Sequence, residues 1–193
     1  MITVFLSVFL LRSSAHAQQN GSSPDAEIHI WPVQGNVYML VGDGANITVQ
    51  VGDQGVLLVD TGLAKMSANL LAAVRSLSDK PVRYIIDTND DPDHVGGNES
   101  VAKAGSTITG GNVVGDIGAS AGDTATVIAF QSILDRMSMP KGNQSAIPQS
   151  EWPTDTYTVP QKSFWFNGES IESFTSQASP MVTAWSIFAV RMS

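Results

Sequence analysis

The sequence predicts an α/β domain with mixed sheets, and three features support this prediction. Several short apolar runs separated by turn residues come first and indicate strands. An apolar run, a stretch with apolar residues at helical spacing and a second apolar run then follow in the order of a β-α-β unit. A further helical stretch and more strands complete the chain. Its 193 residues suit one domain, since domains usually contain about 100–200 residues.

Four short strands are expected in the amino-terminal part. Asn46 to Val51 alternates apolar and polar residues, which is typical of a strand with one buried face. Val56 to Val59 is continuously apolar, as in a strand covered on both faces. Turn residues separate the predicted strands, which are 28–31, 37–41, 46–51 and 56–59.

Two long helices are predicted from the spacing of apolar residues, at 63–77 and at 127–137. Pro81 follows the first, and a buried strand is expected at 82–86. Residues 88–97 are expected to form a polar loop, and the Gly-rich stretch 112–122 carries no prediction. The shorter predicted elements are a helix at 100–104 and strands at 107–109, 156–159 and 163–174, the last with a turn at Asn167-Gly168.

Composition excludes several classes of partner and site. The formal net charge is -8 and the sequence pI is about 4.6, and no Lys/Arg cluster occurs, so nucleic acid is not expected as a partner. The chain has no cysteine, which excludes disulfides, thiolate metal sites and cysteine nucleophiles. A metal would have to be held by His, Asp, Glu or Asn, and only three histidines occur: His16, His29 and His94.

The first residues have the features of an export signal. Ile2 to Leu11 is apolar but too short to span a bilayer, so no stable membrane span is expected. Small residues at Ala15 and Ala17 suit a cleavage site. We therefore predict a signal peptide at 1–17, a disordered mature amino terminus at 18–27 and a periplasmic or extracellular location. The alternative is a buried amino-terminal strand.

The stretch 88–98, T-N-D-D-P-D-H-V-G-G-N, follows a buried strand and contains the residues best suited to chemistry. A carboxylate next to an imidazole in a loop at the end of a strand is a common metal-ligand pair. Gly96 and Gly97 would let the backbone pass close to a ligand or ion. The alternative is a turn rich in Asp and Asn that ends in one polar histidine.

This stretch resembles the T-H-x-H-x-D-H motif of the metallo-β-lactamase superfamily, with its trailing G-G-N. Upstream, G-V-L-L-V-D-T-G at 55–62 is similar to that family's strand ending in D-T-G, and residues 152–157 and 166–169 look like its next hairpin. The resemblance covers roughly 28–174. It implies an αββα sandwich, here the N-terminal part only with an incomplete second half. It also implies zinc-dependent hydrolysis of an ester, amide or lactam type bond.

Carried over to this chain, the resemblance gives a degenerate motif. Asp93 and His94 match the final D-H, Asn89 stands at the first motif histidine, and Asp91 stands at the second. It implies Asp93 as the catalytic residue, and Asp93, His94 and Asp91 as ligands for one zinc ion at most. Gly96, Gly97 and Asn89 would support the site. Asp60 of the D-T-G element would hold the metal loop from behind, or would cap the following helix.

Two further residues that could bind a metal are expected to have no role in the chemistry. His29 lies outside the motif and is expected to be a structural or surface histidine. Asp90 is expected to be a solvated loop residue.

No histidine follows His94, although the family needs later ligands. Residues 28–178 would be a partial metallo-β-lactamase-like domain, and 179–193 an aberrant tail. Codons for 180–193 can encode D-G-D-S-M-V-Y-F-R-R-S-D-V in a shifted frame, which is similar to the family, so we hypothesise a frameshift. The alternative is a natural divergent terminus. The uncovered apolar sheet would favour self-association.

Two functions from different classes remain open. The first is a metallo-β-lactamase-fold hydrolase of a small-molecule substrate, weak or inactive as this chain. The second is a non-catalytic exported binding or accessory protein that kept the fold. An unrelated periplasmic binding module is disfavoured by the paired D-T-G and D-H-x-G-G-N elements.

Overall fold

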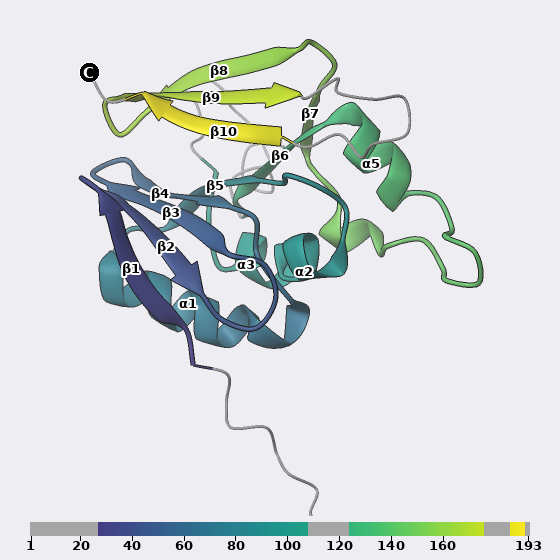
Figure 1. The fold of residues 1–193 in the computed structure, drawn as a ribbon, viewed down its shortest axis with the longest axis horizontal. Helices are drawn as coiled ribbons and strands as arrows, with labels where there is room; N and C mark the ends of the chain where they lie inside the picture. Colours follow the sequence, from purple (N-terminus) through teal and green to yellow (C-terminus); the bar gives the residue numbers. More distant parts are fainter. Residues whose placement is uncertain (1–26, 108–123, 176–185, 192–193) are drawn as a thin grey trace, which may run out of the picture.

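A computed structural model of the chain describes residues 27–107, 124–175 and 186–191 (Figure 1). These residues form a seven-stranded sheet in the order β1-β2-β3-β4-β5-β6-β7 and a three-stranded sheet in the order β10-β9-β8. Several predictions fall outside the described residues: the signal peptide at 1–17, nearly all of the disordered stretch at 18–27, the Gly-rich stretch at 112–122, and residues 179–185 and 192–193 of the tail.

The larger sheet begins as an antiparallel meander and ends as a parallel sheet. Its antiparallel strands are β1 (His29–Gln34), β2 (Val37–Val41), β3 (Ile47–Gly52) and β4 (Gly55–Val59). The parallel strands β5 (Val82–Ile86), β6 (Thr126–Phe130) and β7 (Asp155–Tyr157) then follow β4. The five strands predicted between residues 28 and 86 are confirmed, with small shifts at their ends.

Helices cover one face of this sheet. The predicted helix at 63–77 is a 3₁₀ turn, η1 (Ala64–Met66), followed by α1 (Ser67–Leu77). The expected loop contains the short helix α2 (Pro92–Val95). The short helix predicted at 100–104 is present as α3 (Asn98–Lys103), shifted by one to two residues. Leu70 and Val74 of α1 and Val101 of α3 pack on the sheet. Their partners include Leu40, Val49, Leu58 and Ile85.

The helix predicted at 127–137 is wrong in its first half. Residues 126–130 form β6, and only Gln131–Met137 form a helix, α5. Val127, Ile128 and Ala129 are at most 2% exposed because β6 lies between β5 and β7 with both faces covered. A short apolar run of this kind cannot be assigned to strand or helix by spacing alone. Thr107, expected at the start of a strand, lies in none.

The smaller sheet contains β8 (Gln161–Phe166), β9 (Glu169–Thr175) and β10 (Ser186–Arg191). The predicted turn at Asn167-Gly168 is confirmed, and both residues have positive φ, 53° and 80°, as in a type I′ hairpin turn. β10 comes from the stretch predicted to be an aberrant tail and pairs antiparallel with β9.

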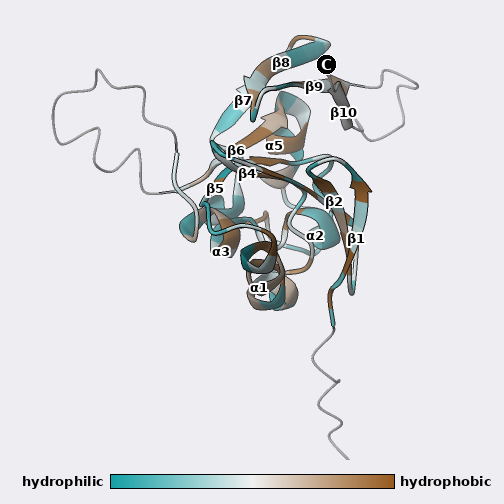
Figure 2. Ribbon diagram, turned by 90° about the vertical axis from the view of Figure 1, so that its left-hand side faces the viewer, coloured by the Kyte–Doolittle hydropathy of each residue, from teal (hydrophilic) through white to brown (hydrophobic). Residues whose placement is uncertain are grey.

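The two sheets pack face to face (Figure 2). Their shared core consists of Leu57, Val59, Ile86, Ile128, Tyr157, Phe166 and Ile171. The layers are therefore helix, sheet and sheet, and no helix of the described ranges covers the outer face of the smaller sheet (Figure 1). This matches the expected partial αββα sandwich. Apolar surface does remain open, because Trp31 and Val33 of β1 are 58% and 60% exposed and Trp165 of β8 is 70% exposed.

No helix within the described ranges is long and apolar enough to cross a membrane. The remaining 3₁₀ turn, η2 (Gln149–Glu151), precedes β7.

Asn167 fastens the smaller sheet to the turn between β3 and β4. Its Oδ1 accepts a hydrogen bond from Gln54 N at 3.0 Å, and its Nδ2 donates to the Gly55 carbonyl at 3.1 Å. Asn167→Ala removes both bonds and leaves alanine at positive φ. Each hydrogen bond and the positive φ of alanine changes stability by about 1 kcal/mol. We therefore expect the free energy of unfolding, measured by urea denaturation, to fall by roughly 2–3 kcal/mol.

Gln161→Ala is the control, because this residue lies exposed on the same hairpin. It should change the free energy of unfolding by no more than about 0.5 kcal/mol. Equal losses in the two variants would show that the Asn167 contacts do not hold the sheets together.

Candidate functional site

Thr88 to His94, here called the motif loop, lies at the carboxyl ends of two neighbouring strands. β4 and β5 are parallel and adjacent, so the residues that follow them meet at one edge of the sheet. Asp60, Thr61 and Gly62 follow β4, and the motif loop follows β5. The fold therefore brings the D-T-G element against the motif loop.

The Asp60 carboxylate holds the motif loop. Oδ1 accepts the Thr88 backbone N–H at 2.8 Å, and Oδ2 accepts the Thr88 hydroxyl at 2.7 Å. Oδ2 also lies 2.7 Å from His94 Nδ1. Asp60 is 4% exposed and has a φ of 64°, a conformation that aspartate tolerates better than most residues. No side chain caps the following helices, whose N-cap positions are Leu63 and Met66.

His94 is fixed through one ring nitrogen and through its backbone. Because Nδ1 contacts Asp60, Nε2 is the nitrogen left for another partner. The His94 carbonyl accepts hydrogen bonds from Thr61 N at 2.7 Å and Gly62 N at 3.1 Å. The hydrogen bond with Asp60 raises the pKa of His94, and negative charges on Asp60, Asp93 and Asp91 add to this effect against partial burial.

Asp60→Asn should lower the pKa of His94, because a neutral amide cannot stabilise the imidazolium through its charge. Nuclear magnetic resonance titration of the His94 ring nitrogens measures this directly. Asp43→Asn removes a carboxylate that pairs with Lys65 instead, and it should leave the titration of His94 almost unchanged. A pKa that stays the same in Asp60→Asn would contradict the assignment.

The predicted metal ligands do not converge. Asp91 is exposed, whereas Asp93 and His94 are partly buried on α2. Asn89 is 1% exposed, and its Oδ1 accepts the Asp91 backbone N–H at 2.7 Å. Among the described residues no group of three or more His, Asp or Glu could hold a metal ion. A catalytic zinc usually takes three protein ligands and a water, so these residues do not fit one.

Gly96 and Gly97 allow close contact between this part of the chain and residues 61–64. A Cβ at Gly96 would lie 2.5 Å from the Pro92 carbonyl oxygen and 2.9 Å from Ala64 N. A Cβ at Gly97 would lie 2.6 Å from the Thr61 carbonyl oxygen. All three distances are shorter than real Cβ contacts, so glycine at both positions is what permits this close packing of the backbone.

A buried network of polar side chains lies behind the motif loop and was not predicted from the sequence. Asn98 Nδ2 donates to Asp87 Oδ2 at 2.9 Å, and Asn98 Oδ1 accepts the Thr61 hydroxyl at 2.8 Å. Asp87 is 0% exposed, and its Oδ1 has no hydrogen-bond partner. Burial raises the pKa of Asp87 well above its ordinary value of 3.8, the charge of Asp60 adds to this, and the Asn98 bond opposes it.

As pH rises above the ordinary carboxyl pKa, Asp87 ionises in the unfolded chain before it ionises in the folded chain. Its contribution to the free energy of unfolding therefore decreases with rising pH. Asp87→Asn keeps an acceptor for Asn98 and removes this ionisation. As the pH is raised from about 4 to about 8, the free energy of unfolding of the variant should increase relative to that of the wild type.

Urea denaturation across this range measures the difference. The exposed Asp79→Asn variant is the matched control and should show no such trend. A parallel pH dependence in Asp87→Asn and wild type would contradict a buried, neutral carboxyl at Asp87.

Asp90 is not the solvated loop residue that was predicted. It is 1% exposed, its Oδ1 accepts Arg136 Nε at 2.6 Å, and its Oδ2 accepts the Lys141 ammonium. Burial alone would raise the pKa of Asp90, but the hydrogen bonds and charges of Lys141 and Arg136 hold it below its ordinary value. The sequence gives no periodic signal for this pairing, because the partners are 46 and 51 residues away.

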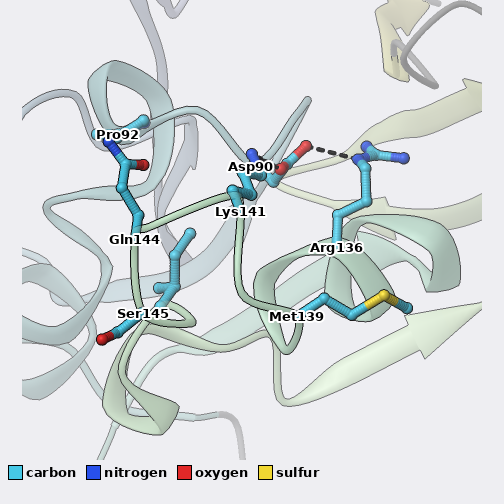
Figure 3. Close-up of a pocket in the computed structure, with 8 residues that line it drawn as sticks. Asp90, Pro92, Arg136, Met139, Lys141, Gln144 and Ser145 are labelled. Atoms are coloured by element: carbon cyan, nitrogen blue, oxygen red, sulfur yellow. Dashed lines mark hydrogen bonds and ion pairs between the residues drawn. The ribbon is translucent and has the colours of Figure 1, made fainter.

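A pocket lies behind this part of the loop (Figure 3). Asp90, Arg136 and Lys141 form one wall, with Met139, Gln144 and Ile147 among the other lining residues. Within this wall the Asp90 carboxylate and the Arg136 guanidinium point toward one another and are joined by their hydrogen bond (Figure 3). The remaining histidine of the described ranges, His29, is exposed on β1 as expected.

The sequence profile of the metallo-β-lactamase superfamily matches residues 31–160. No curated protein matches the chain. Among solved structures, a B3 metallo-β-lactamase with an active-site glutamic acid is similar at a TM-score of 0.61 and 18% identity, over 86% of this chain and 57% of its own.

Two further structures show the same fold. BJP-1, a subclass B3 enzyme of Bradyrhizobium japonicum, has a TM-score of 0.60 and 18% identity over 83% of this chain and 57% of its own. LRA-12, a class B3 di-zinc enzyme from an Alaskan soil metagenome, has a TM-score of 0.63 and 13% identity over 86% and 58%. The chain thus spans somewhat more than half the length of these structures.

Proposed function

We propose that this chain, which belongs to the metallo-β-lactamase superfamily, derives from a zinc-dependent hydrolase of ester, amide or lactam type bonds and is weak or inactive as it stands. We also propose that the chain is exported, because residues 1–17 have the apolar run and the small residues of a signal peptide. The substrate would be a small molecule. Asp93 and His94 would be the remaining part of the site, with His94 Nε2 free because Asp60 binds Nδ1.

The observation that carries the proposal is the state of the two motif positions that lack histidine. Asn89 is buried, and its side-chain oxygen accepts a hydrogen bond from the Asp91 backbone N–H. Asp91 is exposed and forms no three-donor group with Asp93 and His94. Two neighbouring donors bind zinc weakly, since the ion gains few bonds for the water it gives up. A hydrolytic centre therefore lacks support from the described residues.

The second candidate is a non-catalytic binding or accessory protein. The side chain at position 89 favours it. The Asn89 side-chain oxygen accepts a hydrogen bond from the Asp91 backbone N–H and is therefore already engaged within the loop. In that case the fold is retained while the chemistry is absent. The two candidates differ in whether any turnover depends on His94.

Zinc content after equilibrium dialysis, measured by mass spectrometry, tests the proposal together with hydrolysis of a chromogenic ester and a chromogenic lactam. The wild-type chain should hold well below one zinc per molecule and hydrolyse neither substrate faster than zinc in buffer. Asn89→His/Asp91→His adds two imidazoles and should raise zinc affinity by about tenfold or more. His94→Ala in that background should reverse part of the gain.

Stoichiometric zinc and turnover in the wild-type chain, both abolished by His94→Ala, would overturn the proposal and indicate an active atypical centre. Specific binding of a small molecule without zinc or turnover would favour the second candidate.

A further inference from the structure

We propose that an ion-pair clamp formed by Asp90, Arg136 and Lys141 fixes the motif loop in this chain and takes over the positioning that bound metal gives to a metal-dependent loop. This inference goes beyond the proposed function, because it concerns what holds the loop rather than what the loop does. It rests on the mismatch between the residues of the loop and a zinc site.

A metal ion orders its ligands by drawing them together, and its binding free energy is then also folding free energy. In this chain, groups of the protein itself hold the loop at both ends and in the middle. Asp60 binds Thr88 and the His94 ring at the ends. Asn89 closes a turn onto Asp91, and Asp90 is tied down between them.

The ion pairs of Asp90 with Arg136 and Lys141 hold the motif loop from the buried side. A carboxylate that is only 1% exposed stays ionised only when it is paired and hydrogen-bonded. Each of its oxygens has its own cation, with Arg136 Nε on Oδ1 and Lys141 Nζ on Oδ2. Breaking a buried pair by removing one partner is costly, because it leaves a charge without compensation.

The clamp also joins distant parts of the fold. Arg136 lies on α5 and Lys141 on the turn that follows it, so Asp90 links the loop after β5 to the segment after β6 (Figure 3). Arg136 is further held by Ser132, which accepts a hydrogen bond from Nη1 at 3.2 Å. Lys141 is held by paired backbone bonds with Gln144. The cations therefore sit on ordered backbone.

The full chain provides the test, with thermal unfolding and amide hydrogen exchange as readouts. Asp90→Asn should lower the Tm by roughly 5–10 °C, given that 1 kcal/mol shifts the Tm of a chain of this size by about 2–4 °C. It should also speed exchange at the backbone amides of Asp91 and of residues 93–95 more than at those of β4 and β5. Chelator should leave the wild-type Tm unchanged, and added zinc should raise it by less than about 2 °C.

Asp43→Asn is the matched control, because it breaks the exposed Asp43–Lys65 pair and should shift the Tm by less than about 2 °C. Should Asp90→Asn fail to fold, Lys141→Gln removes one cation that is 47% exposed and should give the same local exchange pattern with a smaller Tm change. A Tm that falls on chelation, or an Asp90 variant that behaves like Asp43→Asn, would overturn the clamp.

Discussion

The Asp60 carboxylate accepts hydrogen bonds from Thr88 and contacts His94, and the rest of the motif loop depends on these contacts. They require a parallel pair of strands, because only then do the ends of β4 and β5 lie side by side. They also require an aspartate in the left-handed region, with φ of 64°, which costs conformational energy that the surrounding bonds offset. The two glycines at 96 and 97 complete the contact by letting the backbones meet.

The loop thus combines inherited and local interactions. Asp60, His94 and the two glycines lie in the motifs that resemble the metallo-β-lactamase superfamily, whereas Arg136 and Lys141, the partners of Asp90, lie outside those motifs. Asn89 and Asp91 stand at the two motif positions where the resemblance implies histidine, and the contacts of Asp60 are formed with these residues in place.

The elements that could be predicted from the sequence are those whose signal is local. Alternation and turn residues located β2, β3 and the β8–β9 hairpin, and the resemblance at D-T-G indicated that Asp60 would lie near the motif loop. The error at 127–137 arose because four apolar residues in a row fit a covered strand and a helix equally well. The burial of Asp87 and Asp90 could not be predicted, since their partners come from segments brought close only by the fold.

The order of strands in the larger sheet has a consequence for how the molecule is made. Strands β1 to β7 lie in the sheet in the same order as in the chain, so no strand has to be inserted between two that are already paired. Such a sheet can grow by addition at one edge as the chain folds from its amino-terminal strands onward. Each added strand finds its neighbour already in place, so at every stage only β1 and the most recently added strand have an unpaired side.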